Sequence, residues 1–89
     1  MCLVVVAAFA TPQWPFVLAA NRDERHARAT TAAAWWPDRP NMLGGRDLEA
    51  GGTWLAVDRR GRAAAVTNLR DGERPASARS RGGLVAEFV

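Results

Sequence analysis

The first twenty residues place the strongest constraint on the fold of this chain. No charged residue occurs between Leu3 and Ala20, but Pro12 and Pro15 interrupt this apolar stretch. A membrane-spanning helix needs roughly 20 continuous apolar residues. A secretory signal starts with basic residues, and the first basic residue here is Arg22. We therefore expect neither a stable membrane span nor a targeting segment.

The same stretch fits a β-hairpin. The segment "CLVVVAAF" is rich in valine, which favours a strand that is buried on both faces. Two prolines place a turn in "ATPQWP", and "FVLAAN" supplies a second strand. If the turn centres near Gln13, antiparallel pairing brings position 2 beside position 24, within a residue or two. Cys2 and the cluster "NRDE" at 21–24 should then lie at the same end of the hairpin.

A second hairpin is predicted further along the chain. Residues 25–41 show no sustained period, so we expect an irregular segment there. After it, "TWLAVD" and "AAAVTN" have the composition of strands, and Gly61 lies between them where a tight turn is needed. Pairing about this turn sets Thr53 near Asn68.

The last ten residues, "SRGGLVAEFV", have the pattern of a helix that is beginning. Ser80 is a suitable N-cap, and Leu84, Val85 and Phe88 would share one face. The apolar face of such a helix is incomplete where the sequence stops, so we interpret the chain as the N-terminal part of a longer protein. Two hairpins followed by the start of a helix belong to the α+β class.

Composition limits the range of partners. The chain has 89 residues, which is enough for one small domain, and its net charge is +3. All twelve basic residues are arginines, scattered along the chain without a dense block, so we expect no nucleic-acid partner. Arginine also suits carboxylate and phosphate groups. An arginine-rich anion binder therefore stays open, and it requires an affinity that falls steeply with salt.

Cysteine and histidine usage excludes several other classes of site. Cys2 is the only cysteine, so an internal disulfide and a C-x-x-C metal or redox motif are both absent from the sequence. A reducing compartment suits such a chain, and we expect a cytoplasmic location. His26 is the only histidine, and no spacing of ligands around it predicts a metal site or a cofactor.

Cys2 has a position that could make it a nucleophile. Removal of Met1, which is favoured when the next side chain is small, would leave a residue that carries both a thiol and a free α-amine. The amine has a reference pKa of about 8 and can act as a base for the thiol near neutral pH. The alternative interpretation is a small, inert apolar residue, which is a frequent role of free cysteine.

The cluster that follows the second strand contains the residue types that such a nucleophile needs. Arg22 beside a thiol would favour the thiolate, and Asp23 could hold an ammonium group. Asn21 could donate a hydrogen bond to a developing oxyanion. The alternative is a charged exit from a strand into solvent.

Several motifs together resemble the NRDE family, which includes the transport and Golgi organisation protein 2 group. They are "MCLVVVAAF", "FVLAANRDE", "LGGRDLEAGGTWLAVDRRGRAAAVTNLRD" and "SRGGLV", and they extend over the whole chain in the order of the family. The resemblance implies an N-terminal nucleophile (Ntn) hydrolase-like αββα sandwich. Residues 1–89 would form the N-terminal part of that single domain, and its C-terminal remainder would be missing.

The resemblance also implies a set of site residues. Cys2 would be the nucleophile, and Arg22 and Asp23 look similar in role to the arginine and aspartate of penicillin V acylase and bile-salt hydrolase relatives. Those relatives space the two residues apart, whereas here they are adjacent, and adjacent strand residues point to opposite faces. Both can reach Cys2 only if the strand has already ended. Further candidates are Asn21 and Asn68 for catalysis, and Glu24, Thr53, Trp54 and Arg70 for substrate binding.

Two functional hypotheses follow from these residues and the resemblance. The first is a hydrolase in which Cys2 attacks an amide or thioester carbonyl without a cofactor. The second is a non-enzymatic carrier of haem or of a lipid or acyl-CoA in intracellular trafficking, in which Cys2 is a haem ligand or incidental. The partner is in both cases a small acyl, lipid or haem-like molecule. Because two hairpins leave one sheet face uncovered, we also expect marginal stability or self-association of the chain.

Overall fold

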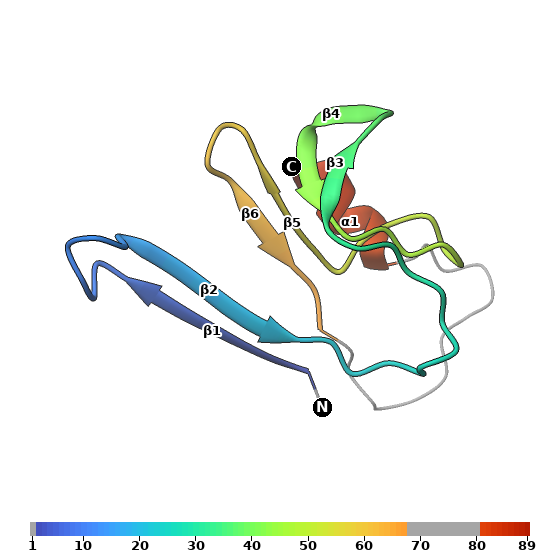
Figure 1. Ribbon diagram of the computed structural model, residues 1–89, viewed down its shortest axis with the longest axis horizontal. Helices are drawn as coiled ribbons and strands as arrows, with labels where there is room; N and C mark the ends of the chain where they lie inside the picture. The colour runs from blue at the N-terminus through green and yellow to red at the C-terminus, as the bar shows by residue number, and fades with distance from the viewer. Residues whose placement is uncertain (1, 68–80) are drawn as a thin grey trace.

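The computed structural model describes residues 2–67 and 81–89, and these form two antiparallel sheets and one helix (Figure 1). This arrangement confirms the predicted α+β class. The elements follow one another as β1 (Leu3–Ala8), β2 (Phe16–Asn21), β3 (Ala34–Trp36), β4 (Arg39–Gly44), β5 (Leu55–Asp58), β6 (Ala63–Ala65) and α1 (Arg81–Phe88). The described residues include no helix that is long and apolar enough to span a membrane.

The first sheet is the predicted hairpin of β1 and β2. Leu3 pairs with Asn21 and Ala8 with Phe16, so position 2 lies opposite position 22, within the predicted tolerance. The N–H of Phe9 donates to the carbonyl of Pro15 at 2.6 Å and closes the turn. Phe9 has a φ of 57°, in the left-handed region that non-glycine residues seldom occupy. The two prolines occupy the turn, where no ladder N–H is required.

The hairpin is far more exposed than its valine content predicted. Leu3 is 60% exposed, Val5 52% and Val6 55%, so the expectation of a strand buried on both faces is wrong for the described structure. Figure 1 shows the reason, because β1 and β2 extend away from the other elements as a two-stranded arm. Valine favours the extended backbone wherever it lies, but burial depends on a second layer that packs against the strand.

The second sheet has the order β3-β4-β5-β6, and all of its neighbours are antiparallel. The pair β5–β6 is the predicted second hairpin. The pair β3–β4 was not predicted, since its residues fall largely in the segment expected to be irregular. A change of register between Trp35 and Trp36 interrupts the alternation of apolar residues there. Such an irregularity hides a strand from a search for a period of two.

The core lies between this second sheet and α1. Its buried side chains belong to Trp36, Met42, Ala56, Val85 and Ala86. The indole N–H of Trp36 donates to the carbonyl of Gly44 at 3.0 Å, so this buried polar group is satisfied. The four-stranded sheet is therefore the part of the described chain that has a core of its own.

The helix presents a different face to the core from the one predicted. Val85 is buried as expected, but Leu84 and Phe88 are 61% and 56% exposed, and the prediction for these two residues is wrong. The neighbour of Val85 in the core is Ala86, whose carbonyl accepts a hydrogen bond from Arg39 at 2.6 Å. A side chain as small as alanine lets the helix approach the sheet closely. Ser80, the predicted N-cap, lies outside the described residues.

Candidate functional site

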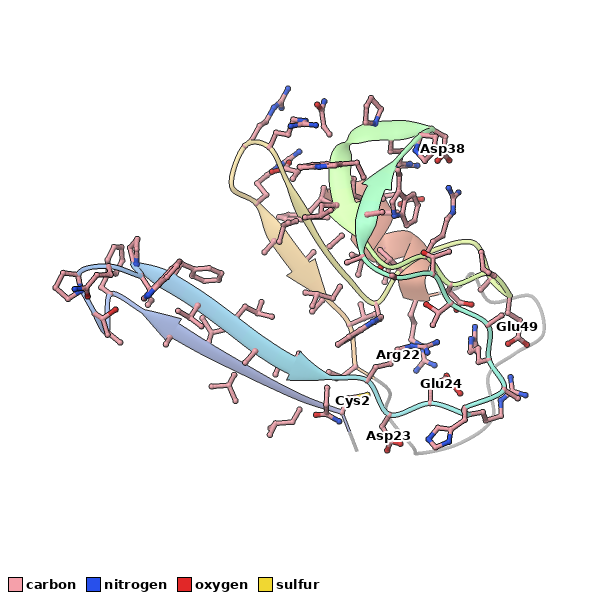
Figure 2. The ribbon with its side chains drawn as sticks, in the orientation of Figure 1. Cys2, Arg22, Asp23, Glu24, Asp38 and Glu49 are labelled. Atoms are coloured by element: carbon pink, nitrogen blue, oxygen red, sulfur yellow. The ribbon has the colours of Figure 1, made fainter. Side chains whose placement is uncertain are left out.

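Cys2 lies at the end of the hairpin that faces the rest of the molecule (Figure 2). It immediately precedes β1, its thiol is free, and the residue is partly buried. The backbone N–H of Asp23 donates to the Cys2 sulfur, with 3.4 Å between nitrogen and sulfur. A donor at this distance can stabilise a negative charge on sulfur. The pairing of β1 with β2 thus brings the thiol to the cluster at 21–24, as the spacing predicted.

A cavity of about 100 Å³ adjoins this thiol. It is lined by residues from the end of the first hairpin, from the loops after β2 and β4, from the segments just before β5 and just after β6, and from the start of α1. Its lining consists of Cys2, Arg22, Glu24, Arg28, Thr30, Asp47, Thr53, Trp54, Val66, Arg81 and Gly82. Segments that are far apart in the sequence therefore converge on one small, largely polar space.

The predicted site residues divide into three groups. Five of them line the cavity, namely Cys2, Arg22, Glu24, Thr53 and Trp54. Asn21 and Asp23 lie beside it but do not line it, and Asn68 and Arg70 fall outside the described residues. The chemical roles assigned to all nine residues remain predictions.

Arg22 and Asp23 are adjacent residues whose side chains point in different directions. The strand β2 ends at Asn21, so both residues lie beyond it. Figure 2 shows their side chains on opposite sides of the chain, with Arg22 on the side of the cavity. Asp23 contributes its backbone N–H to the Cys2 sulfur. The carboxamide oxygen of Asn21 accepts the N–H of Leu3 at 2.9 Å, which ties the two strands together at this end.

Glu24 is held by positive and polar groups around its carboxylate. The N–H of Arg25 donates to it at 2.9 Å, and Arg28 lies 3.6 Å from its other oxygen. The backbone hydrogen bond is the larger cause, and with the charge of Arg28 it holds the pKa of Glu24 below its usual 4.5. Glu24 is therefore an anion at neutral pH and balances part of the positive charge of the cavity.

Arg28 and Asp47 are among the residues of the cavity that were not predicted as site residues. The Arg28 guanidinium binds Asp47 through two hydrogen bonds, of 3.0 Å from Nε and 2.7 Å from Nη2. This contact with Asp47 is the main cause that raises the pKa of Arg28. Arg28 stands four residues after Glu24, and Asp47 ends the "GGRD" motif, so both lie beside recognised motifs, but no local sequence signal shows that they pair.

Thr53 and two glycines join the cavity to the helix. Thr53 is 1% exposed, and its hydroxyl donates to the carbonyl of Leu55 at 3.0 Å. A Cβ on Gly52 would lie 2.6 Å from the carbonyl carbon of Gly82, and a Cβ on Gly82 would lie 2.9 Å from the nitrogen of Thr53. Only glycine permits this close backbone contact. The motifs "GGTW" and "SRGG" thus meet where α1 begins.

The charge of the cavity is mixed, with a positive excess. Three arginines, Arg22, Arg28 and Arg81, line the cavity together with two acids, Glu24 and Asp47, and Arg28 forms ion pairs with both acids. Among the described residues, no three histidine, cysteine, aspartate or glutamate side chains come together in a way that could hold a metal ion. The groups that are present can stabilise a thiolate or an anionic reaction intermediate near Cys2.

A second, larger groove lies next to the cavity. It has a volume of about 530 Å³, and its lining is mostly apolar. Alternate residues of β2, Phe16 and Leu18, face it, together with the apolar side chains of β4 and β5. Arg22, Thr30 and Trp54 line both spaces, so the groove and the cavity share a border. A volume of this size is within the range of small-molecule sites.

Comparison with known proteins places the whole chain in one group. The sequence model of the Transport and Golgi organisation 2 family matches residues 1–89. The Transport and Golgi organization protein 2 of Drosophila melanogaster is 40% identical over 98 residues, which cover 100% of this chain and 35% of that protein. The homologues of Bos taurus and Homo sapiens are 45% and 42% identical over 76 residues, or 82% of this chain and 28% of each relative. No solved structure matches the chain.

The chain thus spans about a third of the length of these curated relatives. The motifs around the cavity all lie within the matched residues.

Proposed function

The chain belongs to the Transport and Golgi organisation 2 family, and on this premise we propose that it carries the nucleophile of a hydrolase. Cys2 would be the attacking residue, and the substrate would contain an amide or thioester bond. The observation that supports this proposal is the position of the Cys2 sulfur, which receives the N–H of Asp23 and shares one cavity with Arg22 and Arg81.

The reaction would begin after the removal of Met1. The α-amine of Cys2 accepts the thiol proton, and the thiolate attacks the carbonyl carbon of the substrate. A carbon–sulfur bond forms, and the negative charge that develops on the carbonyl oxygen is stabilised by the nearby guanidinium groups of Arg22 and Arg81. The carbon–nitrogen or carbon–sulfur bond of the substrate then breaks, and the ammonium returns its proton to the leaving group.

Water completes the cycle. The α-amine removes a proton from a water molecule as it attacks the Cys2 thioester. The carboxylic acid leaves, and the thiol and the amine of Cys2 are regenerated. Glu24 keeps a negative charge at neutral pH beside these groups, and it could hold the ammonium in place between the two steps.

Intact mass spectrometry tests this proposal directly. The chain is exposed to an activated amide and to a thioester probe, and its mass is recorded before and after. We expect the loss of Met1 and the addition of one acyl group at Cys2, the only cysteine of the chain. Cys2→Ala should fold and show no acylation. Retention of Met1, or acylation that is unaffected by Cys2→Ala, would overturn the proposal.

A second candidate function is the carriage of an apolar ligand, and the apolar groove favours it. A lipid, an acyl group or haem could occupy this space, with any anionic group near Arg22 at the border of the cavity. The names of the relatives, which refer to transport and Golgi organisation, agree with such a role. In this case Cys2 would be a ligand of haem iron or would not take part.

Binding measurements separate the two functions. A carrier should bind haem or a fatty-acyl probe saturably without the formation of product. Leu18→Asp, which alters the groove, should weaken binding, whereas its neighbour Val17→Asp should not, because Val17 does not line the groove. Turnover of the bound acyl probe would favour the hydrolase. Equal effects of the two substitutions on binding would show that the groove is not the binding site.

A further inference from the structure

We propose that Arg28 and Asp47 are positioning residues for Cys2. Their ion pair, here called the loop clamp, would hold the loop after β2 in the conformation that presents the Asp23 N–H to the Cys2 sulfur and Arg22 to the cavity. The inference rests on the proposed function, in which Cys2 is the nucleophile. Neither residue needs to touch the substrate for this role.

Asp47 is suited to the clamp because both of its carboxylate oxygens are used. One oxygen accepts the two hydrogen bonds from Arg28, at 3.0 and 2.7 Å. The other accepts the backbone N–H groups of Glu49 and Ala50, at 2.9 and 3.3 Å, and so organises its own loop. Side chains of Arg28 and Asp47 are only 22% and 18% exposed, which protects the pair from screening by solvent. An asparagine at position 47 could satisfy one of these two partners but not both.

A short series of contacts connects the loop clamp to the Cys2 thiol. Arg28 binds Asp47 on one side, and on the other side its Nη1 lies 3.6 Å from the carboxylate of Glu24. Glu24 adjoins Asp23 in the chain, and the N–H of Asp23 contacts the Cys2 sulfur. The position of this N–H is therefore coupled to the ion pair through the loop. Loss of the pair would weaken the hold on this loop and let it move away from the thiol.

The fold around the clamp has separate supports. Thr31 donates its N–H to the carbonyl of Arg46 at 2.9 Å, and Leu48 donates to the carbonyl of Ala29 at 3.0 Å. These backbone bonds do not involve the side chain of Arg28. Its replacement should thus loosen the loop of residues 22–25 while the two chain segments stay together.

The chain contains a natural control for this ion pair. Arg46 binds Asp38 through two hydrogen bonds of 2.6 and 3.0 Å, as short as those of the clamp. Asp38 is well exposed, neither residue lines the cavity, and Figure 2 shows Asp38 far from Cys2. Asp38→Asn therefore removes an arginine–aspartate pair of the same chemistry at a place where the proposal assigns it no role.

The first measurement is the rate at which iodoacetamide alkylates Cys2 in the full chain at neutral pH. Donors around the sulfur stabilise the thiolate, which is the reacting species. We expect Asp47→Asn and Arg28→Gln to slow alkylation about threefold, and Arg28→Lys to restore part of the rate. Asp38→Asn should leave the rate unchanged. Circular dichroism and thermal unfolding verify that each variant is folded. Equal rates in the wild type and in folded clamp variants would overturn the proposal.

A double-mutant cycle distinguishes positioning from general destabilisation. The quantity compared is the alkylation rate of Cys2. If the clamp acts through the loop that carries Arg22, the effects of Arg22→Gln and Asp47→Asn on this rate should be non-additive, because either substitution removes the placement of Arg22 beside the thiol. Additive effects would contradict the proposal. Acylation by the thioester probe, measured in parallel, should fall about 10- to 100-fold in the clamp variants. If the wild type is alkylated but never acylated, the proposed hydrolase is wrong, while the alkylation rates still decide whether the clamp positions Cys2.

Discussion

The two sheets of this chain are stabilised in different ways. The four-stranded sheet packs against α1 and buries Trp36, Met42 and Val85, whereas the hairpin of β1 and β2 leaves Leu3 and Val5 largely exposed. The hairpin is held by its own ladder of hydrogen bonds and by its turn, and an isolated pair of strands is marginally stable in water. The core and the candidate nucleophile thus belong to different parts of the molecule.

The cavity lies at the junction of these two parts. The end of the hairpin contributes Cys2 and Arg22, which flank its strands, and the segment that leads into β5 contributes Thr53 and Trp54. The charged loops between them, including the clamp of Arg28 and Asp47, connect one part to the other. The geometry of the site therefore depends on polar contacts more than on a shared apolar core, and the following predictions test that comparison.

The largest expected effect is the loss of core packing in the second sheet. Met42 is 2% exposed, so Met42→Ala should lower the free energy of unfolding by about 2–5 kcal/mol. Leu3→Ala in the hairpin should change it by about 0.5 kcal/mol or less, since Leu3 is 60% exposed. Urea denaturation of both variants measures the two effects. If the two substitutions lowered the free energy of unfolding by similar amounts, the hairpin would have to pack against an apolar core of its own, which contradicts its exposure.

The next effect concerns the contact between the second sheet and α1. A Cβ on Gly82 would lie 2.9 Å from the backbone nitrogen of Thr53, so Gly82→Ala should destabilise the chain by about 1–3 kcal/mol. A Cβ on Gly83 meets nothing within 4 Å. Gly83→Ala should therefore stabilise the helix by about 0.5–1 kcal/mol. Thermal unfolding checks both signs, and destabilisation by both substitutions would contradict the backbone contact proposed as the cause.

The smallest effect is the dependence of stability on pH. Partial burial alone would raise the pKa of Asp47, but Arg28 and two backbone N–H groups bind its carboxylate and hold its pKa below the usual 3.8. At Asp58, burial alone would also raise the pKa. The backbone N–H and the guanidinium of Arg62 bind the carboxylate and hold its pKa below the usual 3.8. A lowered pKa contributes stability that is present above pH 3.8 and is lost as the pH falls through the folded value.

Acidification should therefore act on one part of the molecule more than on the other. No ionisable residue occurs between Leu3 and Ala20, so the hairpin ladder should respond little, whereas the second sheet and its loops should loosen. Amide exchange measured at pH 6 and at pH 3 would report both regions. Asp47→Asn should make the loss of stability with falling pH shallower. An unchanged slope in this variant would show that Asp47 does not contribute to it.

Local sequence was sufficient to predict the hairpins β1–β2 and β5–β6, but not the exposure of the first one. Valine density, Pro12 and Pro15 set the limits of β1 and β2, and the spacing placed Cys2 within two residues of its observed partner position. The strands β3 and β4 escaped prediction because the register changes between Trp35 and Trp36. The buried face of α1 was mispredicted as well, since periodicity does not show which side of a short helix meets a sheet.

The candidate site was predictable where it depends on hydrogen-bond register and was missed where it depends on loops. Cys2, Arg22 and Glu24 follow from the pairing of one hairpin, and five predicted residues do line the cavity. Arg28 and Asp47 come from loops whose approach to each other is not encoded in any local period.

The sequence by itself determined the hairpins β1–β2 and β5–β6, their turns and the meeting of Cys2 with the "NRDE" cluster, because these depend on local propensity and on the spacing across one turn. Only the tertiary structure decided which arginine pairs with which acid, which face of α1 is buried and that the hairpin stands apart from the core. Those features depend on contacts between segments distant in the chain, and many such contacts are compatible with the same local pattern.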